Sequence, residues 1–527
     1  MMENQAEIVK AMSHKNFYPC PTSMVKIIQT HISYIFVGDE DVYKVKKPVN
    51  FGFLDFTTKE KRRFYCEQEV ILNRRLAPKF YEDVVAITRE SSGAFTINGA
   101  GEVMEYAVHM KKIPTNMMLK NLLAQGKAGI AVLDKVAQRL AEFHRNAATN
   151  EKINKMGKLE TIRFNHEENF AQTQPFIELT ISPLAHRCIQ NYVSTFLEKN
   201  EELLLSRVAQ GKIRDCHGDL HIEHIICEDE EISIFDCIEF NDRFRHSDVA
   251  ADVAFLAMDL DYNGFEDLSR SFVSSYIKHS ADDAVLLLLN FYRCYYAFVR
   301  GKVISFRLNE KSLAATERVA TAKLAGRYFD LALRYATALK KPTLIIICGL
   351  MGTGKSQMAR TLTSMLGIDS VVMDVLRKEL LNIPPHEKHY EAFSSGIYSA
   401  EMTKQVYDVA FAMAQKSLAA GKSIIIDASF KKQEMRLAVQ RLAMELGADF
   451  LAIRCVCPDS IVEERLKRRA LRSTGASDGR WEIYAEQKQN TDAFSHFSED
   501  EFFTVDTSGN RQDSIFTALA EMAKRLL

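Results

Sequence analysis

One segment of the sequence combines glycines with a lysine and a serine at the spacing that phosphate binding requires. The run Gly349-Leu-Met-Gly-Thr-Gly-Lys-Ser356 follows an apolar stretch and precedes a helical pattern. Glycines let backbone N–H groups surround a phosphate, and the N-terminus of the following helix adds about half a positive charge. The residues that we expect to bind the phosphates of a nucleotide are Gly349, Gly352, Thr353, Gly354, Lys355 and Ser356.

The side chains of this loop and one later aspartate suit a nucleotide that carries Mg²⁺. Lys355 can reach the β- and γ-phosphates, and the Ser356 hydroxyl can bind the metal ion. Asp427 directly follows the apolar run at 423–426 and can orient the same ion or its water. A chance glycine turn is the alternative, but it explains neither the Lys-Ser pair behind the glycines nor the strand-like run before them. We therefore expect ATP and Mg²⁺ at this loop.

Two further groups of charged residues in the second half suit the handling of an acceptor and of phosphates. Asp374 and Arg377 follow the apolar run at 370–373, at the edge where ligands collect in open α/β sheets. Asp374 can take a proton from an acceptor hydroxyl, and Arg377 can hold an acceptor phosphate or carboxylate. A surface ion pair is the alternative. Arg465 and Arg469 have no acid four residues before them, which suggests phosphate contacts from a mobile lid, with a solvated basic face as the alternative.

The first half contains a segment rich in histidine and aspartate that allows two interpretations. The segment at 215–226 reads DCHGDLHIEHII and is followed at 232–240 by ISIFDCIEF. One interpretation is a metal cluster, with the ligands His217, Asp219, His221 and His224. The other is a phosphotransferase loop, in which Asp219 accepts the proton of the acceptor hydroxyl and Asp236 binds Mg²⁺.

Residues upstream of this segment favour the phosphotransferase interpretation. Lys44 lies in a strand-like run at 41–46 and can reach ATP phosphates, with Lys46 as the rival lysine. Glu69 lies on the helical run that follows. An ion pair between Lys44 and Glu69 would be the pair that kinases use to position phosphates, and zinc hydrolases need neither residue.

The elements that must position these residues divide the chain into two halves. From 343 onward the apolar runs TLIIIC, SVVM, SIII, FLAIRC and FFTV alternate with amphipathic helical patterns. This alternation predicts a five-stranded parallel sheet with helices on both faces. Before it, β-rich runs at about 20–115 precede long helical patterns at about 116–338. We therefore predict two domains, 1–338, with these two lobes, and 339–527.

Composition and charge exclude several classes of protein. The 527 residues contain 68 Lys and Arg against 69 Asp and Glu, so no overall basic field attracts nucleic acid or a membrane surface. The most apolar stretch, at 284–299, is shorter than the roughly 20 residues of a bilayer span and contains a charge. The first residues lack the apolar core of a secretory signal. We expect a cytoplasmic protein with no membrane segment.

The second half, from about 343 to 527, resembles the small phosphoryl-transfer kinases of the adenylate-kinase-like group, which are often labelled AAA-type ATPases. The resemblance depends on the phosphate loop and is nearest to polynucleotide-kinase-like, zeta-toxin-like and antibiotic O-kinase-like domains. Asp374-x-x-Arg377 looks like the acceptor-site pair of polynucleotide kinases, in which the aspartate is the general base. This likeness implies that the 5′-hydroxyl of a nucleic acid is one candidate acceptor of the second half.

The first half, from about 20 to 335, resembles the aminoglycoside phosphotransferase and choline-kinase branch of the kinase-like fold. The motif HGDLHxxHI at 217–225 is similar to the HGDLHxxNI of that branch. The resemblance implies that Asp219 is the catalytic base, Asp236 a metal ligand, Lys44 the phosphate lysine and Glu69 its partner. It also implies that Glu105 and Ala107 belong to the hinge that binds adenine, and that Asp248 and Asp252 brace the catalytic loop.

His224 departs from that branch, which has a metal-binding asparagine at this position. As a ligand for the hard ion Mg²⁺, neutral imidazole is poorer than an amide oxygen. The number of metal ions and the activity of the first half therefore stay open, with His224 as a candidate metal ligand.

Both halves together resemble a bacterial two-domain group in which an aminoglycoside-phosphotransferase-like domain precedes a P-loop kinase-like ATPase. The expected fold is an α+β kinase-like, two-lobed domain followed by an α/β P-loop domain. The resemblance implies ATP binding, and we expect each half to transfer the γ-phosphoryl of ATP to an acceptor hydroxyl, most simply that of a small molecule. The alternative is a nucleotide-sensing regulatory ATPase whose first half binds ATP without transfer, and His224 favours it.

Overall fold

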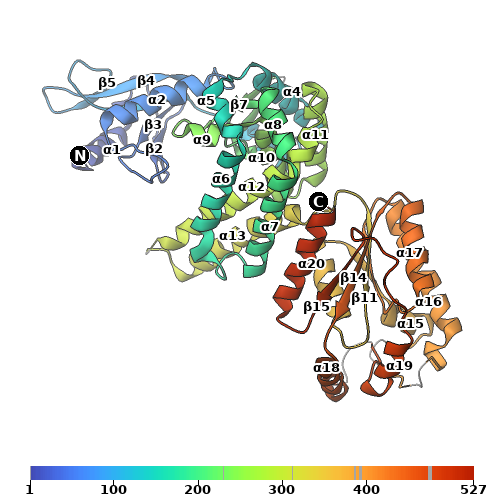
Figure 1. Ribbon diagram of the computed structural model, residues 1–527. Helices are drawn as coiled ribbons and strands as arrows, with labels where there is room; N and C mark the ends of the chain where they lie inside the picture. Colours follow the sequence, from blue (N-terminus) through green and yellow to red (C-terminus); the bar gives the residue numbers. More distant parts are fainter. Residues whose placement is uncertain are drawn as a thin grey trace. The chain divides into compact units, whose positions relative to one another are not determined.

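The chain folds into two compact units, each with its own sheet (Figure 1). The computed structural model describes residues 2–228, 231–310, 312–384, 387–390, 394–472 and 477–526, without the side chains of residues 2–4 and 472. Unit 1 comprises residues 1–168 and 200–299, and unit 2 comprises residues 169–199 and 300–527.

Unit 1 begins with a six-stranded antiparallel sheet. Its order is β1 (Lys26–Gln29), β2 (Ser33–Val37), β3 (Asp41–Lys46), β6 (Glu102–Lys111), β4 (Tyr81–Arg89) and β5 (Phe95–Ile97). Side chains alternate along β3, so that Val42 packs with helix α2 (Lys59–Asn73) while Tyr43 and Val45 pack with α1 (Met2–Met12) on the other face. Lys44 and Lys46 share the face of Val42, and both therefore point toward α2.

The rest of unit 1 is mainly helical. Its helices are α3 (Leu119–Ala124), α4 (Ile130–Asn146), α5 (Glu151–Asn154), α6 (Leu159–Thr173), α8 (Glu201–Ala209), α9 (Asp242–Arg245), α10 (Val249–Tyr262), α11 (Glu266–Ser280) and α12 (Val285–Phe306), of which α6 and α12 continue into unit 2. Two short antiparallel pairs complete it, β7 (Ile213–Asp215) with β10 (His246–Asp248), and β8 (Ile225–Glu228) with β9 (Glu231–Ile234). Twelve of the fourteen residues of α10 are buried, which explains why its sequence is mostly apolar. The loops that carry Asp219 and Asp236 are thus mounted on rigid, buried elements.

Unit 2 contains a parallel sheet of five strands. Their order is β12 (Asp369–Val372), β13 (Ile424–Asp427), β11 (Thr343–Cys348), β14 (Asp449–Val456) and β15 (Phe502–Asp506). All six residues of β11 are buried, as expected for the central strand of a sheet that is covered on both faces. The five apolar runs predicted as strands form these five strands, and the predicted fold class of both halves is confirmed.

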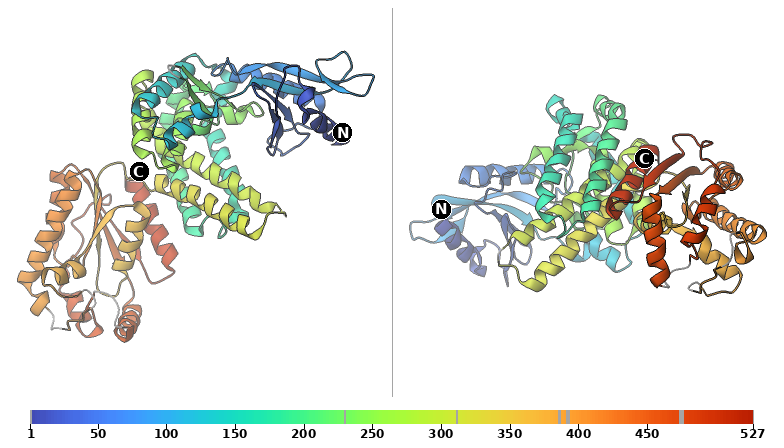
Figure 2. Two further views of the ribbon diagram at one scale, coloured as in Figure 1. Left: turned by 180° about the vertical axis from the view of Figure 1, so that it is seen from behind. Right: turned by 60° about the horizontal axis from the view of Figure 1, so that its bottom comes forward.

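Helices cover both faces of the parallel sheet. On one face lie α15 (Met373–Leu380), α16 (Ala400–Ala419) and α17 (Gln433–Glu445), and on the other lie α14 (Lys355–Leu366) and α20 (Arg511–Leu526). Figure 2 shows the orange helices and the red C-terminal helix on opposite sides of the strands. Two further helices of this unit, α18 (Asp459–Arg472) and α19 (Tyr484–Gln489), lie near the phosphate loop.

The compact units are not continuous in the sequence. Helices α7 (Pro183–Lys199) and α13 (Ala315–Ala336) precede residue 339 but belong to unit 2. Cys188 of α7 is part of the apolar core that contains Ile515 and Leu519 of α20. The domain ranges 1–338 and 339–527 remain a prediction. The compact units are defined by contacts and assign residues 169–199 and 300–338 to the same unit as the parallel sheet.

Among the residues that the structure describes, no helix combines the length and the apolar composition needed to cross a membrane.

Candidate active sites

In unit 1, Lys44 lies between two carboxylates that come from different elements. Its Nζ is 2.8 Å from Glu69 Oε1 on α2 and 3.0 Å from Asp236 Oδ1, just after β9. Burial opposes the charge of the lysine, but Asp236 and Glu69 raise the pKa of Lys44 well above its usual value. A lysine held in this way is charged at neutral pH and can contact phosphate oxygens.

Lys46, the rival lysine, contacts Glu69 from the inner side. Its Nζ is 2.6 Å from Glu69 Oε2 and also forms an ion pair with Glu239, and its side chain is completely buried. Lys44 retains some exposure, 12% of its side chain. The geometry thus gives Lys44 access to a ligand and Lys46 a place in a buried ion-pair network.

The loop that carries Asp219 is fixed by one buried carboxylate of α10. Asp252 accepts hydrogen bonds from the backbone N–H groups of His217, at 2.7 Å, and Gly218, at 2.9 Å. Gly218 has a φ of +85°, and a Cβ atom there would lie 2.8 Å from the Phe244 carbonyl oxygen, so only glycine fits. The side chain of Asp219 is about one-third exposed (32%), which leaves it accessible to an acceptor.

Asp248 and Asp252, which were predicted to brace the catalytic loop, have different partners. Asp252 holds the loop, whereas Asp248 is paired with the buried Arg207 at 2.6 Å and begins α10. Sequence reasoning missed the brace supplied by Asp259, which accepts the N–H of Ile222 at 2.9 Å. Its position two helical turns after Asp252 was the available signal.

Asp236 has an uncommon backbone conformation. Its φ is +61°, in the left-handed region that a non-glycine residue adopts only at a cost. The backbone N–H of Asp236 donates to the Tyr81 hydroxyl at 3.3 Å, and Asn73 accepts the N–H of Cys237 at 2.8 Å. Burial opposes ionisation, but Lys44 lowers the pKa of Asp236 far below its usual value, so this carboxylate is charged.

His224 connects the two candidate catalytic aspartates. Its Nδ1 lies 2.9 Å from the Asp219 carbonyl oxygen, and its Nε2 lies 3.5 Å from Asp236 Oδ2. His217, by contrast, uses both ring nitrogens: Nε2 donates to the Phe235 carbonyl at 3.0 Å and Nδ1 accepts from the Asp219 N–H at 3.3 Å. The predicted metal cluster therefore loses His217 as a ligand, while Asp236 and His224 present donor atoms that fit a divalent ion.

The structure corrects the expected hinge at Glu105 and Ala107. Both residues lie inside strand β6 and not at its end. Ala107 pairs with Val45 of β3 and with Val85 of β4, so its backbone groups are used within the sheet. Glu105 is buried and forms an ion pair with Arg62 at 2.7 Å. The backbone of Ala107 is therefore not available to adenine, and the side chain of Glu105 is engaged within the unit.

In unit 2, the phosphate loop joins β11 to α14 in the expected way. Gly349, Gly352 and Gly354 all have positive φ angles, and a Cβ atom at Gly352 would lie 2.8 Å from Val462 Cγ1 of α18. Lys355 Nζ donates to the Leu350 carbonyl at 2.8 Å and the Thr353 hydroxyl donates to the same oxygen at 2.7 Å. The lysine is thereby held over the loop that would surround the phosphates.

Asp427 lies at the end of β13, next to the start of α14. One of its oxygens, Oδ2, is buried and has no hydrogen-bond partner among the described residues. Burial raises the pKa of Asp427, and Lys355 and a contact with the Ser356 hydroxyl oppose this shift. An orphaned carboxylate oxygen beside a serine hydroxyl fits Mg²⁺, which prefers oxygen ligands and keeps several of its waters.

Two of the arginines predicted as site residues of unit 2 form hydrogen bonds within the protein. Arg377 is buried. Its Nη1 donates to the Ile397 carbonyl at 2.9 Å, whereas its buried Nε has no hydrogen-bond partner among the described residues. Arg465 donates to the hydroxyl of Thr507 at 3.2 Å. Burial lowers the pKa of Arg469, and the charge of Asp374 opposes that shift.

The predicted mobile lid is also corrected. Val462 and Leu466 of α18 are buried against Leu350 and Met351 of the phosphate loop. The first turns of α18 are therefore anchored to the loop.

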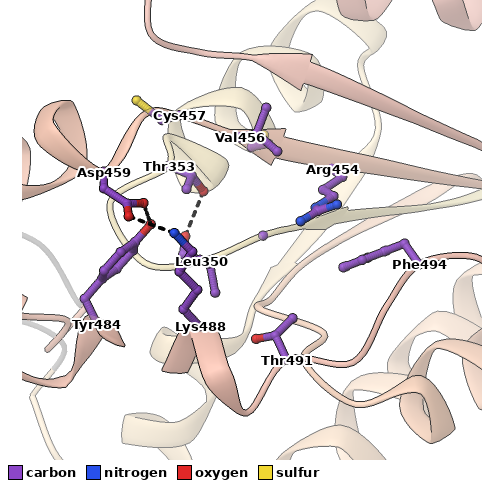
Figure 3. A pocket seen from close by; sticks show the side chains of 12 residues that line it. Leu350, Thr353, Arg454, Val456, Cys457, Asp459, Tyr484, Lys488, Thr491 and Phe494 are labelled. Atoms are coloured by element: carbon purple, nitrogen blue, oxygen red, sulfur yellow. Dashed lines mark hydrogen bonds and ion pairs between the residues drawn. The ribbon is translucent and has the colours of Figure 1, made fainter. Parts of the chain in front are cut away.

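A pocket lies beside the beginning of the phosphate loop (Figure 3). Its lining includes Gly349, Thr353, Arg454 and Lys488, and Asp459 accepts from Tyr484 at 2.8 Å and from Lys488 at 2.7 Å. Lys355, Ser356 and Asp427 do not line this pocket, so it is not the place where the phosphates would be held.

Known proteins resemble the chain either in its C-terminal part or along nearly its whole length. Residues 344–494 match the family model of an AAA domain. An uncharacterised protein of Mycobacterium tuberculosis (strain ATCC 25618 / H37Rv) is 30% identical over 492 residues, 93% of this chain and 94% of that protein. An uncharacterised protein of Mycobacterium bovis (strain ATCC BAA-935 / AF2122/97) has the same identity and coverage.

Solved structures of kinases are similar to one or the other part. A choline kinase from Cryptosporidium parvum Iowa II aligns with 63% of this chain and 95% of its own, at 12% identity and a TM-score of 0.39. A gluconokinase from Sinorhizobium meliloti 1021 aligns with 35% of this chain and 95% of its own, at 15% identity and a TM-score of 0.25.

The fold and the two sites define a protein of two units, one kinase-like and one P-loop kinase-like with a phosphate loop. The chain belongs to the same family as the full-length mycobacterial proteins.

Proposed function

We propose that the protein is an ATP-dependent phosphotransferase with two sites, one in each unit, and that each site transfers the γ-phosphoryl group to an acceptor hydroxyl. The observation that supports this most directly is the position of Lys44 between Glu69 and Asp236, next to the braced loop of Asp219. Unit 2 adds a complete phosphate loop with Lys355, Ser356 and Asp427.

In unit 1, Lys44 orients the phosphates and Asp219 serves as the base. The acceptor oxygen bonds to the γ-phosphorus while the bond from that phosphorus to the ADP oxygen breaks, and the acceptor proton moves to the Asp219 carboxylate. Asp236 and His224 would hold a divalent ion, which when bound would supply positive charge against the phosphate oxygens. Lys44 and Glu69 keep their relative position throughout because Lys46 fixes the other oxygen of Glu69.

In unit 2, the phosphate loop and Lys355 hold the triphosphate, Asp374 is the candidate base, and Ser356 and Asp427 are the candidate ligands of Mg²⁺. Arg469 is the candidate contact to the transferred phosphate oxygens. Arg377 stays a candidate contact to the acceptor, and we propose a small molecule as the acceptor in both units. A 5′-hydroxyl nucleic acid end is the other acceptor that we would test for unit 2.

The test uses the full-length protein, ATP labelled in the γ-phosphate, and the paired variants Asp219→Asn and Lys355→Ala. Labelled products are resolved after incubation with a small-molecule cell extract and, separately, with 5′-hydroxyl oligonucleotides at low salt. Asp219→Asn should reduce the unit 1 product by about 10²–10⁴-fold, the share of a positioned base. Lys355→Ala should remove only the unit 2 product. Labelled products that both variants form at the parent rate would contradict the proposal.

A nucleotide-sensing regulator is the second candidate function, and His224 favours it because the histidine replaces the expected amide ligand. In that case unit 1 binds ATP, yet Asp219→Asn changes no product. ATP binding without any product sensitive to this substitution would establish the regulator over the transferase.

A further inference from the structure

Each ring nitrogen of His224 lies near an oxygen atom that accepts hydrogen bonds. Its Nδ1 is 2.9 Å from the Asp219 carbonyl oxygen. A carbonyl oxygen only accepts, so Nδ1 must carry the hydrogen atom. In the neutral ring, Nε2 then holds a lone pair, and this nitrogen is 3.5 Å from Asp236 Oδ2. Two lone pairs that face each other at this distance repel, unless a cation lies between them.

The distances around Asp236 suit a shared metal ion. Metal ions bind nitrogen and oxygen ligands at roughly 2.0–2.2 Å, so one ion can reach two atoms that are 3.5 Å apart. The other oxygen of Asp236, Oδ1, is already in contact with Lys44 at 3.0 Å. Oδ2 is therefore the oxygen available to an ion that also binds His224.

A second imidazole, that of His221, lies next to the His224 ring. The ring of His221 lies 3.8 Å from that of His224, centre to centre, and its Nε2 is 3.6 Å from Asp219 Oδ2. Asp219, His221 and His224 each offer a ligand atom within 4.8 Å of the others. The candidate ion site of unit 2, in contrast, consists of oxygen atoms from Ser356 and Asp427.

We propose that unit 1 binds a first-row divalent transition metal in preference to Mg²⁺, through His224 Nε2 and Asp236 Oδ2, while unit 2 uses Mg²⁺. The inference rests on the proposed function in that the ion serves the same phosphoryl-transfer site. Mg²⁺ demands oxygen ligands and releases its waters reluctantly, whereas transition metals bind imidazole readily. One chain would thus carry two transferase sites with different metal requirements.

The direct test is electron spin echo envelope modulation of Mn²⁺ bound to the full-length protein, one equivalent and without nucleotide. Mn²⁺ is a stringent probe because, among the first-row divalent transition metals, it binds sites with nitrogen and oxygen ligands most weakly. The spectrum should show a directly bound ¹⁴N nucleus, and growth with ¹⁵N-histidine should replace that pattern. This comparison needs no variant. Absence of nitrogen coupling in the parent protein, as a ring protonated at both nitrogens would give, overturns the proposal.

Variants then identify the nitrogen. His224→Asn should lose the coupling and bind Mn²⁺ about 10-fold or more weakly, with a smaller change in Mg²⁺ affinity. His279→Asn is the matched control, because His279 pairs with Asp134 at 3.0 Å, away from the site, and it should keep the coupling. Coupling that persists in His224→Asn overturns the assignment, as does coupling lost only in His221→Asn. Circular dichroism of each variant verifies its fold.

The metal inference and the proposed function fail in different ways. Transfer by unit 1 without nitrogen coupling would refute the metal inference and leave the transferase intact. Nitrogen coupling without any product that depends on Asp219 would support the metal site and contradict the transferase.

Discussion

The two lysines of β3 show how the same residue type serves two purposes two positions apart. Both reach Glu69, because alternate residues of a strand point to the same face. Lys44 also contacts Asp236, whose side chain is 43% exposed, whereas Lys46 contacts Glu239, which is nearly buried. The sequence predicts Lys44 as the phosphate lysine with Lys46 as its rival, but nothing in the run at 41–46 shows where Asp236 and Glu239 will lie.

This difference predicts that substitution of Lys44 impairs mainly transfer, whereas substitution of Lys46 impairs mainly stability. Lys44→Met should reduce unit 1 transfer by about 10²-fold or more, the scale of a lost charge-stabilising group, with a small loss of stability. Lys46→Met should lower the free energy of unfolding by about 3–5 kcal/mol, because Glu239 is left buried without its cation. Transfer assays and urea unfolding of both variants decide the matter. Equal stability of the two variants would contradict the assigned roles.

At the scale of elements, the phosphate loop depends on its contact with α18. Gly352 has a φ of +78°, and Val462 and Leu466 occupy the space where a side chain would lie. The loop conformation and the position of α18 are therefore coupled. Sequence reasoning identified the loop from its glycines but described α18 as a lid, because an uncompensated row of arginines does not show which apolar residues anchor the other face.

Gly352→Ala should therefore impair the loop of unit 2. The added methyl group must displace Val462 or the loop, and the left-handed backbone costs about 1–2 kcal/mol, so ATP binding should weaken about tenfold or more. Binding is measured calorimetrically in a Lys44→Met background, in which unit 1 contributes little. Gly326→Ala is the control, because its nearest atom is an ordinary 3.4 Å away and its φ is not positive. Unchanged affinity in Gly352→Ala would contradict the coupling.

The strands of unit 2 could be predicted closely, whereas the adenine hinge of unit 1 could not. Runs such as TLIIIC are apolar throughout, and a buried parallel strand requires this composition at every position. β6 is ten residues long and has no regular alternation of buried and exposed residues, so its sequence does not show how far the strand continues. The resemblance implies a hinge at Glu105, but the strand continues to Lys111. Register and strand length depend on partners distant in the sequence, here β3 and β4.

At the scale of the molecule, unit 1 contains a buried histidine that links its stability to pH. His166 packs against Phe291 and Tyr295, and burial lowers the pKa of His166 to about 3. The unfolded chain takes up a proton near pH 6.5, but the folded unit does not. The free energy of unfolding therefore decreases as the pH falls below about 6.5, and it continues to decrease until the folded state is protonated as well.

We predict that His166 alone lowers the stability of unit 1 by about 2 kcal/mol between pH 7 and pH 5. His166→Gln, which cannot be protonated, should flatten this part of the pH dependence, whatever its effect at pH 7. Urea unfolding of both proteins at the two pH values gives the comparison. A parent and a variant that lose equal stability over this range would contradict a neutral, buried His166.

The membership of α7 in unit 2 has a consequence for how the chain is made. Arg187 of this helix pairs with Asp513 of α20 at 2.6 Å, and Cys188 enters the core beside it. On the ribosome, α7 emerges long before the parallel strands, and the surface around Cys188 stays uncovered until the last helix has been translated. A gene truncated to begin at residue 339 would encode the whole parallel sheet and yet lack part of its covering, so a soluble P-loop fragment has to include residues 169–199.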